Sequence, residues 1–134
     1  MTLTVLRPIT IKARVTEGLK AKMTAELRAG AATLDEELQQ LDVQVKRAQL
    51  SAQLSPQQQM ELRRAVEYER ARRLEQKAEI DARIKDVAQL ELGTEIVQGS
   101  VQGPIDVGVG NDWDAMMRVE ILLEDGQVVA IREG

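Results

Sequence analysis

The feature that most constrains this chain is a long polar run from Thr16 to Glu91, interrupted by a Ser55-Pro56 dipeptide. Serine is a preferred helix N-cap and proline a preferred first helical residue, whereas the residue before a proline resists helical geometry. The dipeptide therefore predicts a turn near residues 53–56 between two helices. We expect the two arms, each about 36 residues or roughly 55 Å long, to fold back on each other as an antiparallel hairpin.

The first arm follows Thr16, a candidate N-cap, and carries a heptad-like apolar seam. Spacings of three and four residues are typical of a coiled coil, and they recur at Leu34, Leu38, Leu41, Val45, Ala48 and Ala52. Gly30 and the capping-box pattern that begins at Thr33 leave two alternatives, a continuous helix or a break near Gly30–Thr33. We favour the continuous helix, because an isolated glycine costs only about 1 kcal/mol.

The second arm has a less regular apolar pattern. We expect its inward face to comprise Leu62 and Val66 near the tip, Ala71, Leu74 and Ala78 in the middle, and Ile80, Ile84 and Val87 near the base. The arm is predicted to end near Glu91, with Gly93 at the C′ position.

Short strands are predicted on both sides of the helical run. Residues 2–15 alternate between apolar and polar side chains, interrupted by Arg7, and Pro8 indicates an edge position or a break into two strands. After the arms, residues 96–101 and 105–109 suggest two strands separated by Gly103-Pro104, followed by a short helical turn through Met117. The Asp125-Gly126 dipeptide between residues 119–123 and 128–131 is a strong hairpin signal.

These elements predict a single α+β domain over residues 1–134. It comprises strand 2–15, helical hairpin 16–92 and strands within 94–132. About five strands would form a small antiparallel sheet or barrel at the base of the hairpin. Phe is absent, and Trp113 and Tyr68 are the only aromatic residues. A compact part of about 55 residues is close to the lower limit for independent stability, so self-association into a homo-oligomer is expected.

The composition argues against an enzyme. The chain has no Cys and no His, which removes cysteine nucleophiles, histidine bases and the usual zinc sites. Gly108–Asp112 lacks the Lys-Ser/Thr of a phosphate-binding loop, and Asp106, Asp112 and Asp114 lack calcium-loop spacing. We therefore expect no catalytic residues, no cofactor and no metal. No stretch is long and apolar enough for a membrane span, so we also expect a soluble protein.

Two features are candidates for an interaction surface. The densest basic cluster comprises Arg63, Arg64, Arg70, Arg72 and Arg73. Interleaved glutamates favour a solvated, ion-paired helix face, and the alternative is a surface for an acidic protein or RNA. Trp113 either packs over the end of a small barrel or contacts a partner.

Three stretches resemble the C-terminal portion of the YlqD family: Leu90–Val101, Val109–Trp113 and Val119–Arg132. Residues 12–16 before the first arm are similar too, so the resemblance covers nearly the whole chain. It is closest to the cyanobacterial form, which has a long helical hairpin. The resemblance implies a bacterial cytoplasmic protein, and it carries over no catalytic or cofactor-binding residue, because the family has no assigned activity.

We expect a non-enzymatic scaffold or interaction protein that self-associates through the apolar faces of its strands or through the seam from Leu34 to Ala52. One alternative is an RNA- or ribosome-associated factor that uses the basic cluster. Another is a prefoldin-like holdase chaperone that grips clients near Leu50, Leu54 and Met60. The prefoldin comparison is an architectural analogy only.

Overall fold

The computed structural model describes residues 1–133, which form two compact units. One unit contains Lys22–Gln89, and the other contains Met1–Ala21 together with the segment from Leu90 onward. The elements in chain order are β1 (Thr2–Arg14), α1 (Glu17–Leu50), α2 (Pro56–Gln89), β2 (Glu95–Gly108), α3 (Trp113–Met117), β3 (Val119–Glu124) and β4 (Gln127–Arg132). The fold class is α+β, as predicted.

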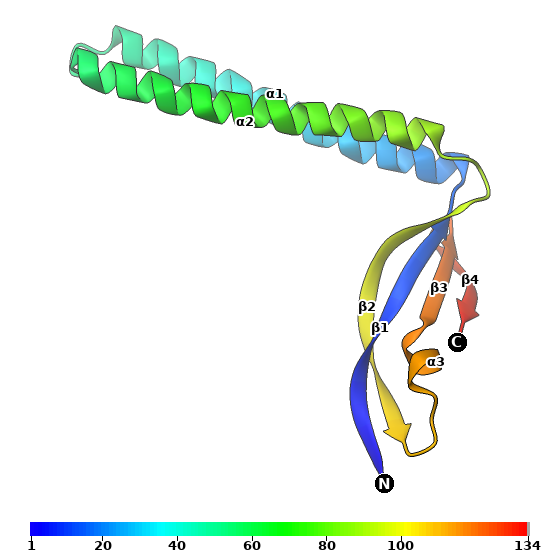
Figure 1. Cartoon of the computed structure of the whole chain (residues 1–134). Helices are drawn as coiled ribbons and strands as arrows, with labels where there is room; N and C mark the ends of the chain where they lie inside the picture. Colours follow the sequence, from blue (N-terminus) through cyan, green and yellow to red (C-terminus); the bar gives the residue numbers. More distant parts are fainter. Residues whose placement is uncertain (134) are drawn as a thin grey trace. The chain divides into compact units, whose positions relative to one another are not determined.

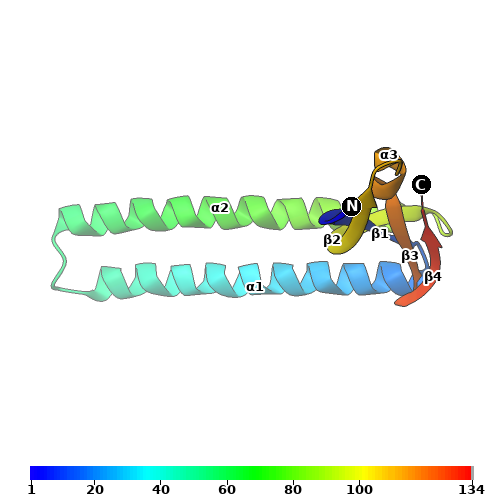
Figure 2. The same ribbon diagram turned by 90° about the horizontal axis from the view of Figure 1, so that it is seen from below.

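The predicted helical hairpin is confirmed, and α1 and α2 lie side by side along their length (Figure 2). The Ser55-Pro56 dipeptide acts as expected. The hydroxyl of Ser55 accepts a hydrogen bond from the Gln58 amide at 3.1 Å, and the Gln58 side chain accepts one from the Ser55 amide at 3.0 Å. This reciprocal capping box satisfies two backbone donors and fixes where α2 begins.

The first helix is continuous through Gly30, as favoured from the sequence. The Thr33 hydroxyl donates back to the carbonyl of Ala29 at 3.2 Å, so it does not cap a new helix. A Cβ atom at position 30 would lie 3.5 Å from Cδ1 of Ile80, an ordinary van der Waals contact. Glycine at this position is therefore tolerated within a helix that packs against its neighbour.

The seam of α1 is largely confirmed, whereas the inward face predicted for α2 is wrong in the middle. Leu34 and Leu41 are buried, but Ala52 lies beyond the helix and is exposed. In α2, Val66 and Val87 are buried, while the predicted seam residues Ala71, Leu74 and Ala78 are exposed. Arg73 and Lys77 are half-buried in their place. Long basic side chains can cover apolar surface with their stems while their charged ends stay in water.

The second unit is built on an open four-stranded sheet in the order β2-β1-β3-β4 (Figure 1). β1 pairs with β2 antiparallel along its whole length and with β3 parallel from Ile9 onward, and β3 pairs with β4 antiparallel. The sheet is therefore mixed and is not closed into a barrel. Four strands form where about five were predicted.

The difference in strand number arises at Gly103-Pro104, which is not a turn but lies within the continuous strand β2. β2 is an edge strand, and one row of its amides has no ladder partner, so proline is tolerated there. Pro8 is likewise inside a continuous strand, in the part of β1 that precedes the pairing with β3. Each proline therefore lies where one side of its strand has no hydrogen-bonded neighbour, and neither proline breaks its strand.

Local capping and turn signals are borne out. Thr16 caps α1 by accepting a hydrogen bond from the Leu19 amide at 3.0 Å, and its hydroxyl donates to the Asp125 carboxylate at 2.6 Å. Asp125 and Gly126 have φ angles of 49° and 82°, as a tight hairpin turn requires. Gly93 also has a positive φ of 87°, but α2 already ends at Gln89. Gly93 therefore turns the chain into β2 instead of occupying the C′ position.

The hydrophobic core is small. Eight hydrophobic residues among those described are buried: Ala13, Val15, Leu34, Leu41, Val66, Val87, Val119 and Leu122. Four of them belong to each compact unit. Large apolar side chains on several strands are instead more than half exposed.

Candidate interaction surfaces

The five arginines predicted as a cluster do not form one basic face. Arg70 forms an ion pair with Asp42 across the two helices, and Arg73 bonds to Glu37 across the hairpin at 2.8 Å. Both are half-buried by these contacts. Arg63, Arg64 and Arg72 are exposed and form no ion pair within residues 1–133. Adjacent helix residues are rotated by about 100°, so these three point in different directions.

The paired basic residues instead join the two arms. Two hydrogen bonds raise the pKa of the Arg73 guanidinium. The bond to Glu69 is the larger cause, and the bond to Glu37 is the second. Lys77 donates to Asp35 at 2.7 Å, and this bond raises the pKa of the Lys77 ammonium. Opposite charges therefore meet across the hairpin where α2 has no apolar seam residue. This arrangement fixes the relative register of the helices.

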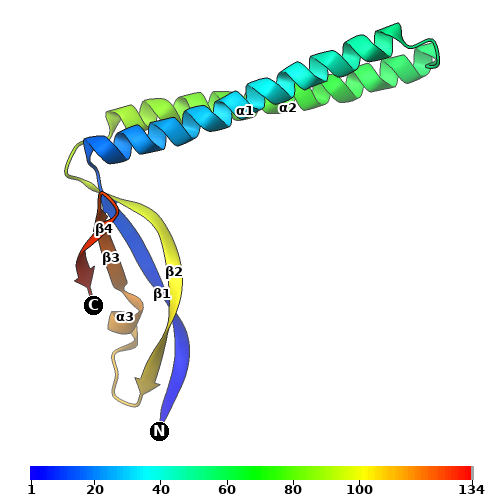
Figure 3. The same ribbon diagram turned by 180° about the vertical axis from the view of Figure 1, so that it is seen from behind.

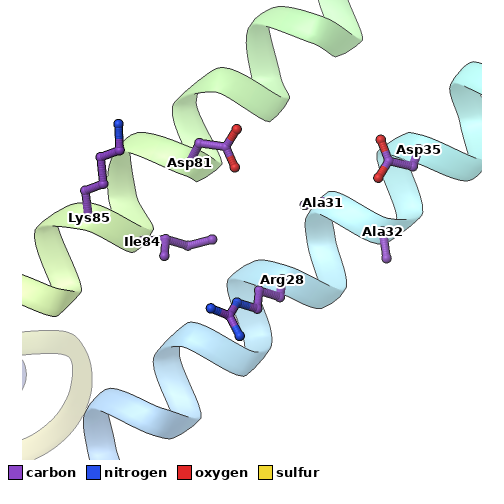
Figure 4. Close-up of a pocket in the computed structure, with 7 residues that line it drawn as sticks. All are labelled: Arg28, Ala31, Ala32, Asp35, Asp81, Ile84 and Lys85. Carbon is purple, nitrogen blue, oxygen red and sulfur yellow. The ribbon is translucent and has the colours of Figure 1, made fainter.

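A groove of about 510 Å³ lies between the two helices (Figure 4). Arg28, Ala31, Ala32 and Asp35 from α1 line it together with Asp81, Ile84 and Lys85 from α2. The small alanine side chains leave this space opposite Ile84. Two acidic and two basic residues give the groove no net charge, so it favours neither an anion nor a cation.

The sheet has one apolar face. Successive strand residues alternate between faces, and paired residues share a face, so the register groups the following residues: Leu3, Val5, Ile9, Ile11, Val101, Ile105, Val107, Val119, Ile121 and Ile131. We call this set the apolar face. Leu3 is 62% exposed, Val101 50% and Ile131 65%. The apolar face is therefore broad and incompletely covered by the chain itself.

The opposite face of the sheet carries ion pairs, and we call it the charged face. Lys12 contacts Glu120 at 2.8 Å, and Arg132 contacts Glu95 at 2.6 Å. The hydrogen bond from Arg132 is the main cause that lowers the pKa of the Glu95 carboxyl. Glu95 lies on β2 and Arg132 on β4, at opposite edges of the sheet. Their contact requires the sheet to curl toward the charged face.

Arg7 is the exception on the apolar face, because it lies between Val5 and Ile9 along β1 and pairs with Gly103 of β2. Its Nη1 donates to the carbonyl of Met116 at 3.2 Å, which ties β1 to α3 beside it (Figure 3). The Nε atom of Arg7 is buried and has no hydrogen-bond partner among the described residues. A cation without a carboxylate therefore lies within an apolar surface.

Trp113 begins α3 and is 54% exposed. It has no barrel end to pack over, because the sheet is open. The structure thus brings Trp113 toward solvent, as the partner-contact alternative requires. Trp113 and the arginine cluster belong to different compact units, so we treat them as separate surfaces.

Within residues 1–133, no group of three or more His, Cys, Asp or Glu side chains is placed to hold a metal ion. No helix in the described part of the chain is long and apolar enough to cross a membrane.

Comparison with known proteins agrees with the fold. Residues 3–132 match the family model described as YlqD protein. The chain belongs to the YlqD family. It is also similar to a crystal structure of a protein of unknown function from Synechococcus sp. WH 8102, with a TM-score of 0.83 and 28% sequence identity. That similarity covers 99% of this chain and 98% of the Synechococcus chain. No curated protein matches this family member.

Sequence reasoning missed Arg7 and the edge residue Ile131 as functional candidates. Arg7 did leave a signal, since it interrupts an otherwise regular apolar alternation. Ile131 left none, because an exposed and a buried isoleucine in a short strand have the same sequence pattern.

Proposed function

We propose that this YlqD-family chain is a non-enzymatic scaffold protein that self-associates through the apolar face of its sheet. The observation that carries the proposal is the exposure of Leu3, Val101 and Ile131 on one face of an open sheet. Exposed apolar side chains that share one face are typical of protein interaction sites. Burying each half-exposed side chain in an interface would contribute on the order of 1 kcal/mol.

The helical hairpin is a weaker candidate for the joint between copies. Leu34 and Leu41, at the centre of the α1 seam, are already buried within the chain. Cross-arm ion pairs occupy the acidic residues Asp35, Glu37 and Asp42 as well. The apolar face of the sheet is covered only in part, because Val119 is buried while Leu3 and Ile131 are more than half exposed, so we assign self-association to the sheet.

A matched pair of variants tests this assignment. Leu3 and Leu6 lie on the same strand and are 62% and 65% exposed, but they point to opposite faces. We expect sedimentation velocity at micromolar concentration to show an oligomer for the wild type and for Leu6→Glu. Leu3→Glu should sediment as a monomer, because a charge on the apolar face cannot be buried against a second copy. A monomeric wild type, or equal behaviour of the two variants, would contradict the proposal.

The arm tip supports a second candidate function, that of a holdase. Leu50, the last residue of α1, is 87% exposed, and Met60 near the start of α2 is also more than half exposed. Exposed flexible apolar side chains can bind varied partners. The double variant Leu50→Ser/Met60→Ser should lose suppression of client aggregation, whereas Leu74→Ser, in the middle of the arm, should retain it. A wild type that never suppresses aggregation would remove this candidate.

No observation favours the RNA-binding alternative over these two. Arg70 and Arg73 are engaged with acidic partners across the hairpin, and the remaining arginines point apart. RNA binding by this chain stays a prediction from sequence.

A further inference from the structure

Strand β4 is the more open of the two edges of the sheet. It runs from Gln127 to Arg132, and each of its residues except Ala130 is exposed. No proline interrupts the strand, and its only charged residue is Arg132 at the end. Natural sheets commonly protect an edge with prolines or charges, because the unpaired main-chain groups of an edge can bind another strand. Neither kind of protection is present along most of β4.

The opposite edge, β2, is protected by its sequence. It contains Pro104, which has no amide hydrogen, and the charged residue Asp106 follows two positions later. The groups that point to one side of an antiparallel strand belong to every second residue, so the outer row of β2 contains Gln102, Pro104 and Asp106. A strand added there would lack one hydrogen bond. The β4 edge is therefore the one at which another strand can pair.

The register of the hairpin shows which main-chain groups of β4 are free. Glu124 and Gln127 flank the two-residue turn and form a hydrogen-bonded pair. Bonded and non-bonded pairs alternate from there along the ladder, so Val128 and Ile131 occupy non-bonded positions. Their amides and carbonyls point away from β3. No turn or loop within residues 1–133 forms a main-chain hydrogen bond with them.

A β-bulge sets the spacing of these free groups. While β3 advances by one residue, the register on β4 passes from Val128 to Ala130, so Val129 is an extra residue without a partner. Val128 and Ile131 are consequently three positions apart, whereas a regular strand presents its free groups at every second residue. An ordinary strand cannot match both positions. A second β4 can match them, because it contains the same bulge.

An antiparallel arrangement of two copies brings these groups together. Val128 of one copy lies opposite Ile131 of the other, the reverse pair forms at the same time, and the two bulges lie between the pairs. Two pairs of this kind exchange about four main-chain hydrogen bonds. The same register places Arg132 opposite Gln127, so no like charges meet across the strands.

The side chains at the two positions also favour this partner. Val128 and Ile131 are 58% and 65% exposed. They pair with Leu123 and Ile121, which are two positions apart on β3 and so share the apolar face. Directly opposite β-branched side chains pack across antiparallel strands. The pairing would therefore cover apolar area that the single chain leaves exposed.

We propose that the free edge of β4 is a second interaction surface and that it pairs antiparallel with β4 of another copy of this chain. The joint is symmetric and connects two sheets into one continuous sheet. It goes beyond the proposed function, because it uses main-chain groups at an edge and not the apolar face. The pairing is short, so it forms at higher protein concentration than association through the apolar face. Copies joined by both surfaces build assemblies larger than a dimer.

Amide hydrogen exchange of the full chain tests the inference. The variant Leu3→Glu removes the contribution of the apolar face, so any association that remains uses another surface. Between micromolar and millimolar concentration, exchange at Val128 and Ile131 should slow roughly tenfold or more. Exchange at Gln102 and Asp106, in the outer row of β2, should not change. If the Val128 and Ile131 amides exchange at one rate over the whole range, the inference is overturned.

A matched pair of proline variants, each made in Leu3→Glu, gives a second test. Val128→Pro removes a free amide from the β4 edge, and Ser100→Pro removes one from the outer row of β2, so neither breaks a hydrogen bond of the chain's own sheet. Sedimentation equilibrium at millimolar concentration should show a monomer for Val128→Pro and unchanged association for Ser100→Pro. Equal association of the two variants contradicts the pairing. If Val128→Pro does not fold, the exchange measurement decides, because it requires no change in β4.

The outcomes separate this inference from the proposed function. If Leu3→Glu associates as the wild type does at micromolar concentration, the proposed function fails, and exchange at Val128 and Ile131 still decides the β4 pairing. If the wild type associates while these two amides stay unprotected at every concentration, only the β4 pairing fails. A peptide of alternating valine and threonine serves as a probe for an ordinary strand. Protection of the two amides by this peptide in dilute protein would contradict the selectivity for a second copy.

Discussion

The helical hairpin and the sheet differ in where their apolar and charged side chains find partners. In the hairpin, apolar and charged residues of α1 find their partners on α2, the next element in the chain. In the sheet, β1 from the start of the chain pairs with β2 and β3, which follow the whole helical run. The hairpin buries its seam internally, whereas the sheet leaves Leu3, Val101 and Ile131 exposed. This difference is the reason why we propose the sheet, and not the hairpin seam, as the surface for self-association.

The two regions should also differ in cooperativity. Contacts across a helical hairpin can be lost turn by turn from the tip, whereas a sheet assembled from distant strands requires long-range pairing before any strand is stable. Two spectroscopic signals follow the unfolding of the two regions separately. Circular dichroism at 222 nm reports mainly α1 and α2, and fluorescence of Trp113, the only tryptophan, reports the sheet unit.

The largest expected effect comes from truncating the buried leucine of the sheet. Leu122 is 2% exposed on β3, and Leu122→Ala should destabilise the sheet unit by about 3 kcal/mol through lost burial and the cavity left behind. The same change at Leu34, on the α1 seam, should cost about 2 kcal/mol, because a two-helix seam can partly collapse around the gap. Urea titrations followed by both signals measure the two effects.

The Leu122→Ala and Leu34→Ala variants should affect the two signals differently. Leu122→Ala should move the Trp113 transition more than the 222 nm transition, and Leu34→Ala should do the reverse. Identical shifts in both signals for both variants would show that the two regions unfold as one cooperative body.

The next effect concerns the tight turn of the sheet. Gly126 has a φ of 82°, a region that L-residues adopt only with strain, so Gly126→Ala should cost about 1–2 kcal/mol. Gly99→Ala is the matched control, because Gly99 lacks a positive φ and its Cβ would meet nothing within 4 Å. That control should be neutral or stabilising by about 0.5 kcal/mol. Thermal unfolding followed by Trp113 fluorescence measures both, and an equal loss in the two variants would contradict the explanation.

A smaller and local effect is expected at the arm tip. Ser55→Ala removes the hydroxyl that accepts a hydrogen bond from the Gln58 amide, which should cost about 1 kcal/mol. Because Ser55 directly precedes α2, the loss should appear as faster amide hydrogen exchange in the first turns of this helix. The Trp113 transition should not move. A shift of that transition would show that the tip is coupled to the sheet.

Local signals predicted much of this fold from the sequence. Ser55-Pro56, Thr16 and Asp125-Gly126 act through residues three or fewer positions away, so their effect is readable without knowing the tertiary structure. The Gly103-Pro104 dipeptide gave the wrong answer for the same reason. Whether proline breaks a strand depends on which side of that strand has a neighbour, and this is a property of the sheet.

The middle of α2 and the parallel pairing of β1 with β3 could not be predicted locally. Leu74 is apolar and Arg73 charged, so the pattern favours burying Leu74, but the position of α1 places Arg73 opposite Glu37 instead. The candidate surfaces also depend on tertiary contacts that a local sequence pattern does not contain. The arginine cluster was visible as composition, but its division into paired and exposed members depends on acidic residues about 30 positions away.

The smallest expected effect concerns pH and the charged face of the sheet. The pKa of Glu95 lies below its ordinary value of 4.5 in the folded chain, chiefly because of the hydrogen bond from Arg132. A carboxyl with a lowered folded pKa stabilises the fold above its unfolded pKa, and this contribution is lost as pH falls through the folded pKa. The difference in urea midpoint between the wild type and Glu95→Gln should therefore be present at pH 7 and shrink below about pH 4.5.

The size of this pH effect should be modest, because the Glu95–Arg132 pair is partly exposed and salt screens it. Glu133→Gln is the control, since Glu133 is exposed and has no ion pair in the described chain. Its midpoint should follow the wild type at every pH. If Glu95→Gln also followed the wild type from pH 7 to pH 3, the bridge between the two edge strands would add nothing to stability. The curl of the sheet would then not depend on this bridge.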